Sequence, residues 1–316
     1  MNDKLKNFPI TVFAIVMGLT GFTIALNKFY HLDWLPKIFY EIMLYVVLGL
    51  FLLFLVVYLI KLVHYPEEVS NDFKHRIRIN FFSTISVSLL LLAVAFYTYY
   101  PMLAIILWWM GLILHTYFTF KTIAFWIQHN FEMKHFNPAW FIPVVGNIII
   151  PVVGVDLLPT TISFFYFSVG FIFWIILFTI FIYRAVFHDQ LAQKFIPTFF
   201  ILLAPPAVGF ISYMRIAASW DGFSIFLLLV SYAIAVLLLF LYKSFTQLKF
   251  FLSWWAFTFP LTALTIASVV AFQVTAQVFY QYLSGMFLVV SIIAISIVSY
   301  QTFIHARKGE ICVQDE

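Results

Sequence analysis

The dominant pattern along this chain is a series of long apolar stretches separated by short polar connections. A helix that crosses the roughly 30 Å hydrocarbon core of a bilayer needs about 20 apolar residues at 1.5 Å each. Ten stretches reach this length, and the one from Ile38 to Leu62 is apolar on every helical face. A transmembrane β-barrel would instead alternate apolar and polar residues in segments of about ten. The pattern predicts an all-α, polytopic integral membrane protein.

The ten predicted spans pair naturally into five helical hairpins within a single transmembrane domain, residues 1–316. Prolines fall at or just before several of the starts, where the missing N–H of proline is harmless. The predicted spans are 8–27, 38–63, 79–99, 101–128, 138–156, 160–187, 196–217, 222–242, 250–274 and 278–304.

Positive charge is distributed unevenly between the two sets of connections. If both termini are cytoplasmic, 14 of the 17 Lys and Arg residues lie on the inside, and only Lys28, Lys37 and Arg215 lie outside. The positive-inside rule therefore predicts that both termini are cytoplasmic. Topology also accounts for the net charge of +4, so no nucleic-acid partner is needed to explain it. With 64% hydrophobic and 9% charged residues, the chain has no material for a separate soluble domain.

Interior prolines occur only in odd-numbered spans. A proline deep in a span frees a carbonyl group, which is tolerated where neighbouring helices, side chains or water can satisfy it. We therefore expect the odd helices to form an inner ring around a central pore, with the even helices outside. The alternative is that membrane helices simply contain more proline and glycine than soluble ones. The helix-breaking residues inside the odd-numbered spans are Gly18 in span one and Pro143, Pro151, Pro205, Pro206 and Pro260 in spans five, seven and nine.

Few groups in the spans could perform chemistry. Charged side chains such as Lys61, Arg184 and Arg215 lie toward span ends, where long side chains reach water. His115 alone lies deep, and a lone histidine there is expected to hydrogen-bond between helices. The loop histidines match no zinc spacing, and Cys312 is the only cysteine. We expect no metal, no other cofactor and no enzymatic activity.

The interior is expected to be neutral and rich in aromatic residues, since the chain has 41 phenylalanines. A passive path closed by an apolar side chain fits such an interior better than a pump does. Phe259, which precedes Pro260 and lies about 15 Å along its span, is the candidate gate. The alternative is that Phe259 is an ordinary packing residue.

Four runs resemble the tellurite-resistance/dicarboxylate transporter family, which includes bacterial TehA and the plant slow-type anion channels of guard cells. They are Ser253–Pro260, Ala204–Gly209, Pro138–Gly146 and His75–Phe82. The resemblance implies a homotrimer in which each protomer has its own pore, and its bacterial members suggest the cytoplasmic (inner) membrane. It also implies that Phe259 is the pore gate, that Phe81 or Phe82 lines the pore, and that kinks at Pro143, Pro205 and Pro260 shape it. Ala14 stands where the family has glycine, which predicts a narrower pore at that point.

The sign of the transported charge comes from this resemblance alone. It predicts an anion channel in the lipid bilayer that passes small monovalent anions such as chloride and nitrate. One alternative is a carrier for C4-dicarboxylate, sulfite or tellurite-type oxyanions. The other is a non-transporting membrane receptor or scaffold, in which the charged tail from His305 to Glu316 is a docking segment.

Overall fold

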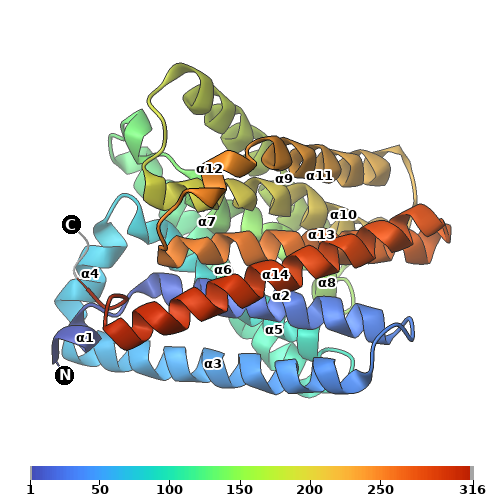
Figure 1. Cartoon of the computed structure of the whole chain (residues 1–316), viewed down its shortest axis with the longest axis horizontal. Helices are drawn as coiled ribbons and strands as arrows, with labels where there is room; N and C mark the ends of the chain where they lie inside the picture. Colours follow the sequence, from blue (N-terminus) through green and yellow to red (C-terminus); the bar gives the residue numbers. More distant parts are fainter. Residues whose placement is uncertain (1, 314–316) are drawn as a thin grey trace.

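The computed structural model describes residues 2–313, and every regular element in that range is a helix. Nine helices in these residues are long and apolar enough to cross a membrane. The long helices run side by side, and α1 (Asn2–Lys6) and the last turn of α14 (Val278–Lys308) lie at the same end of the molecule (Figure 1). We call this the terminal end, and outward means away from it. The arrangement confirms an all-α, polytopic membrane fold.

The stretch expected at 138–156 is not one continuous helix. Pro143 and Pro151 cannot donate a backbone hydrogen bond, and each lies in the first turn of a short helix, where no such bond is needed. The structure instead has four short helices in series: a 3₁₀ helix Pro138–Trp140, α7 (Phe141–Val145), a 3₁₀ helix Gly146–Ile149 and α8 (Pro151–Gly154). The ten helices expected from sequence thus become nine long helices and one broken apolar segment within residues 2–313.

Five segments pack against one another in a closed ring. α2 packs on α5, α5 on the broken segment, the broken segment on α10, α10 on α13, and α13 again on α2. In the four continuous members, 61–83% of the most apolar 18-residue stretch is buried inside the protein. We call these five the inner ring: α2 (Phe13–Tyr30), α5 (Ser83–Phe96), the broken segment Pro138–Gly154, α10 (Ala204–Ala217) and α13 (Thr258–Thr275).

The other five long helices cover the inner ring from outside. Only 22–39% of their most apolar stretches is buried, so their remaining apolar surface faces outward from the fold. Each packs on the inner segment that precedes it in sequence, which gives the five hairpins (Figure 1). These outer helices are α3 (Lys37–His64), α6 (Pro101–Gln128), α9 (Thr160–Phe187), α11 (Gly222–Phe240) and α14. Two short helices, α4 (Pro66–Lys74) and α12 (Tyr242–Thr246), lie in the connections.

Every inner segment starts with a 3₁₀ helix on the side of the terminal end. A 3₁₀ helix rises about 2.0 Å per residue instead of about 1.5 Å, so these starts are thinner and longer than α-helical ones. The change to α-helix comes just before Pro205 in α10 and just before Pro260 in α13, where proline needs no N–H partner. Besides Pro138–Trp140 in the broken segment, the 3₁₀ starts are Ile10–Val12, Arg78–Phe81, Gln193–Leu203 and Leu252–Phe257.

Polar side chains of α6 satisfy the broken segment. Thr119 Oγ1 donates to the carbonyl of Pro143 at 2.6 Å and accepts from Asn147 Nδ2 at 3.0 Å. Trp108 Nε1 donates to the carbonyl of Ile150 at 3.0 Å. His115 shares a hydrogen bond of 2.9 Å with Ser86 of α5, which is the interhelical role expected from sequence.

Candidate functional site

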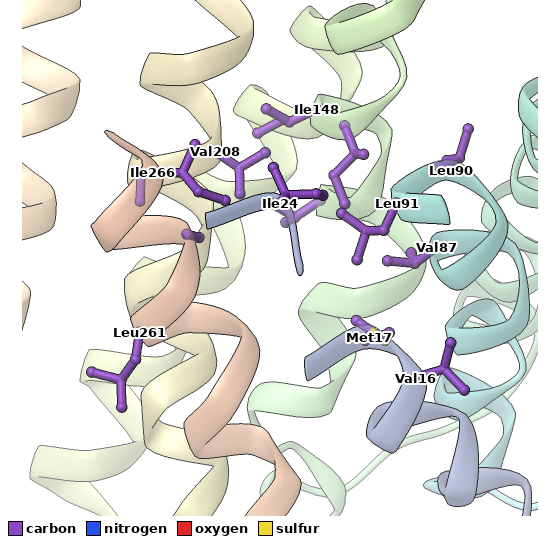
Figure 2. Packing of buried hydrophobic residues seen from close by; sticks show 14 of the residues in the cluster. Val16, Met17, Ile24, Val87, Leu90, Leu91, Ile148, Val208, Leu261 and Ile266 are labelled. Atoms are coloured by element: carbon purple, nitrogen blue, oxygen red, sulfur yellow. The ribbon is translucent and has the colours of Figure 1, made fainter. Parts of the chain in front are cut away.

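The inner ring encloses a cavity of about 370 Å³ near the terminal end. Its mouth is lined by exposed residues, including His75 and Lys194, so the cavity opens at that end. Figure 2 shows side chains from the inner segments arranged around a common space; of these, Met17, Val87, Ile148 and Val208, each from a different segment, line the cavity. The fifth segment, α13, contributes Phe259 and Pro260. All five inner segments therefore build one wall.

The mouth of the cavity is positively charged. Arg78 and Lys194 line it, and no Asp or Glu does so within the described part of the chain. Arg78 pairs with Asp72, a buried carboxylate that is not among the lining residues and that also binds Lys61 Nζ at 3.0 Å. Because fixed positive charge raises the local concentration of anions, this mouth attracts anions toward the cavity.

Lys61 corrects one expectation from sequence. Its side chain does not reach water at the end of its span, because it is only 3% exposed. The carbonyl of Phe8, 2.9 Å from the ammonium group, and the carboxylate of Asp72 replace the lost water. Placing Lys61 at a span end was right, but the group is part of a buried ion pair.

Deeper in the cavity the wall is uncharged. Thr84 and Thr198 line it, but each hydroxyl donates to a carbonyl three residues earlier in its own inner segment. His115 lies behind Gly146, where a Cβ added to that glycine would be only 2.7 Å from His115 Nε2. Residues 2–313 contain no cluster of three His, Cys, Asp or Glu residues that could hold a metal ion. The wall offers weak dipoles and apolar surface, which suits transient passage better than tight binding.

Four of the residues proposed from sequence for the pore line this cavity. They are Phe81, Pro205, Phe259 and Pro260. Phe259 is partly buried, and its ring lies against the backbone of α2, because a Cβ added at Gly21 would come within 3.1 Å of ring atom Cδ2. The missing side chain at Gly21 thus creates the space that this ring uses.

The other residues proposed from sequence, Gly18, Phe82 and Pro143, do not line the cavity and instead support the packing of the inner ring. Phe82 is buried with its ring centroid 4.8 Å from that of Phe73, and it is not a lining residue. At Gly18 an added Cβ would lie 1.9 Å from Thr258 Oγ1, so this glycine brings α2 and α13 together. Pro143 contributes its carbonyl to the bond with Thr119. Ala14 does line the cavity, where glycine would leave more room.

Sequence reasoning overlooked Arg78 and Lys194 as cavity residues, because the positive-inside rule had already accounted for their charge. Each lies at or just before the start of an odd-numbered span, and in the structure these starts converge around the mouth. Their position next to the starts of the odd-numbered spans is therefore the sequence feature that could have identified them as cavity residues.

Comparison with known proteins identifies relatives over most of the chain. A model of the family described as voltage-dependent anion channel matches residues 7–303. An uncharacterized transporter of Methanocaldococcus jannaschii is 28% identical over 295 residues, which cover 83% of this chain and 84% of the relative. The S-type anion channel SLAH2 of Arabidopsis thaliana is 28% identical over 279 residues, covering 84% of this chain and 53% of the plant protein. The tellurite resistance protein TehA homolog of Haemophilus influenzae is 28% identical over 218 residues, covering 67% of this chain and 65% of that protein.

Proposed function

We propose that this chain, which belongs to the voltage-dependent anion channel family, conducts small monovalent anions such as chloride and nitrate through the inner ring, and that Phe259 closes the path. The observation that carries the proposal is the cavity itself, which has cations at its mouth, an uncharged wall and the Phe259 ring on that wall. The SLAH2 relative is named an anion channel, which supports the same sign of charge.

Selection in such a path depends on the cost of removing water from the ion. Among the described lining residues, Arg78 and Lys194 at the mouth are the only Lys and Arg, so an anion farther inside meets no fixed cation. Weak interaction lets the ion leave as easily as it enters. The mouth raises the local anion concentration, and the uncharged interior sets the barrier.

We further propose that the terminal end is cytoplasmic, since 14 of 17 Lys and Arg residues then lie inside. The resemblance to TehA supports an inner-membrane location and a homotrimer with one pore in each protomer. The apolar outer helices supply the lipid-facing and subunit-facing surface that such an assembly needs.

The test is the anion current of Phe259→Ala in oocytes or in liposomes containing the purified chain. Removing the ring should raise the chloride current by roughly tenfold, which corresponds to about 1.4 kcal/mol in the barrier. Phe82→Ala is the matched control, because Phe82 is a buried phenylalanine outside the cavity wall. An unchanged or smaller current for Phe259→Ala, at equal surface expression, would exclude this residue as the gate.

A carrier for dicarboxylate, sulfite or tellurite-type oxyanions is the second candidate, because one relative is named a tellurite resistance protein. A proton-coupled carrier requires a titratable group within the transport path, whereas His75 lines only the mouth and His115 lies behind the wall at Gly146. A reversal potential that follows the chloride gradient and ignores pH supports the channel. Saturable, pH-dependent flux supports the carrier.

A further inference from the structure

The lining of the cavity ends part of the way along the inner segments, and a group of aliphatic side chains lies at its outward end. Ile148 and Val208 belong to the outward part of the lining of their segments, and Ile24, Leu91 and Ile266 lie next to them without lining the cavity (Figure 2). Each of the five inner segments contributes one of these side chains, and each is at most 8% exposed. We call them the aliphatic collar: Ile24, Leu91, Ile148, Val208 and Ile266.

The positions of the collar residues along their helices place them outward of Phe259. Ile266 follows Phe259 by seven residues, which is about 10 Å along α13 and within about 20° of the same helical face. Ile24 follows the cavity residue Met17 by the same interval on α2, and Leu91 follows the cavity residue Val87 by one turn on α5. The collar therefore continues the wall of the cavity instead of belonging to a different face.

Other buried aliphatic side chains on the same helices point in different directions. In Figure 2 the collar side chains converge, whereas Leu261 on α13 and Leu90 on α5 point away from them. Leu261 and Leu90 are equally well buried, at 7% and 1% exposure, but they pack between helices. Burial alone does not distinguish the two groups, but direction does.

Polar groups of α13 at this depth are already used within the helix. Thr262 Oγ1 donates to the carbonyl of Phe259 at 2.8 Å, and Thr265 Oγ1 donates to that of Leu261 at 2.9 Å. An ion at the collar would lose its water without gaining those donors. A constriction lined by aliphatic groups excludes ions both sterically and by dewetting.

We propose that the aliphatic collar is a second barrier to anions, in series with Phe259, and that it sets the order of permeant anions by their cost of dehydration. The inference rests on the proposed anion conduction. Removing Phe259 raises the anion current but leaves the collar in place, and the collar still impedes the more strongly hydrated ions most. Weakly hydrated monovalent anions such as nitrate, iodide and thiocyanate then pass more readily than chloride, and fluoride passes least.

The test compares two alanine variants of α13 in the Phe259→Ala background. Ile266→Ala removes a collar side chain, and Leu261→Ala, five residues earlier, removes a buried one that points away. Ile266→Ala should raise the chloride current by a further three- to tenfold, roughly 0.6 to 1.4 kcal/mol in the barrier, and should reduce the nitrate-to-chloride permeability ratio. Leu261→Ala should change neither. Equal effects of the two variants would refute the collar.

A second variant guards against a folding defect, and the outcomes separate the two proposals. Ile24→Ala, on a different helix, should reproduce the effect of Ile266→Ala at equal surface expression and an unchanged gel-filtration profile. If the Phe259→Ala chain conducts but both collar variants leave its current and permeability ratio unchanged, the collar is refuted and the channel stands. If no variant carries anion current in proteoliposomes, the proposed function itself fails.

Discussion

Replacing Lys61 by methionine should destabilise the protein far more than a typical lysine substitution. The ammonium group connects three segments at the terminal end, since it binds the carbonyl of Phe8 at 2.9 Å and Asp72 of α4 at 3.0 Å while belonging to α3. Its side chain is 3% exposed and that of Asp72 is 8% exposed. Methionine retains most of the apolar stem but leaves the carboxylate and the carbonyl without this donor.

The magnitude follows from what remains after the substitution. Removing one member of a buried ion pair generally costs about 3–5 kcal/mol, because an uncompensated charge stays buried. Here Arg78 still pairs with the other oxygen of Asp72, so the carboxylate is not left alone. We therefore expect the lower end of that range, about 3 kcal/mol, and a melting temperature lowered by several degrees.

The assay is thermal unfolding of the purified protein in detergent, with Lys37→Met as the matched control. Lys37 also forms a carboxylate pair, with Glu41 at 2.8 Å, but both side chains are over 40% exposed, so its loss should not be measurable. The double variant Lys61→Met/Asp72→Leu should recover most of the loss, because it removes both buried charges. A Lys61→Met chain as stable as Lys37→Met, or a double variant less stable than either single one, would refute this reasoning.

Two further outcomes are expected. Gly18→Ala should lower the melting temperature, because the new Cβ would lie 1.9 Å from Thr258 Oγ1, whereas Gly49→Ala, with no atom within 4 Å, should be neutral or stabilising. Hydrogen bonds from the Ser224 backbone N–H and then from the Tyr213 hydroxyl hold the pKa of Asp221 below its ordinary value of 3.8. The stabilisation from this carboxylate is therefore complete above pH 3.8 and is lost as the pH falls further, so the acid-induced loss of stability should be smaller in Asp221→Asn, measured by melting temperature across an acid pH series.

The sequence predicted the helices best where prolines mark their starts. The expected spans 101–128 and 160–187 have the same bounds as α6 and α9, which begin at Pro101 and just after Pro159. Hydropathy does not distinguish 3₁₀ from α-helix, so the 3₁₀ starts of the inner segments could not be foreseen. The expected span 79–99, for example, contains an α-helix only over Ser83–Phe96. The breakers in span five were visible, but their combined effect depends on the hydrogen bonds from α6.

The candidate site was predictable in part, because helical phase can be read from sequence but packing cannot. Phe259 and Pro260 could be located from the proline and the resemblance, and both line the cavity. The choice between Phe81 and Phe82 required the structure, since adjacent residues on a helix differ by about 100° in direction. The aliphatic collar was not visible either, because aliphatic residues occur on every face of these spans.

Hydrogen bonds from the outer helix α6 and from the cavity wall itself keep carbonyls of the inner ring satisfied. Broken and 3₁₀ segments expose more backbone carbonyls than regular helices, and an unsatisfied carbonyl on the wall would attract cations and repel anions. Thr119 and Trp108 of the outer helix α6 bind the carbonyls of Pro143 and Ile150, two residues that do not line the cavity, so these carbonyls are held toward α6. The wall hydroxyls of Thr84 and Thr198 bind carbonyls of their own inner segments. The inner ring can therefore be irregular enough to enclose a cavity without acquiring negative potential. The polar residues of the outer helix α6 therefore contribute to such a ring together with the apolar residues of its wall.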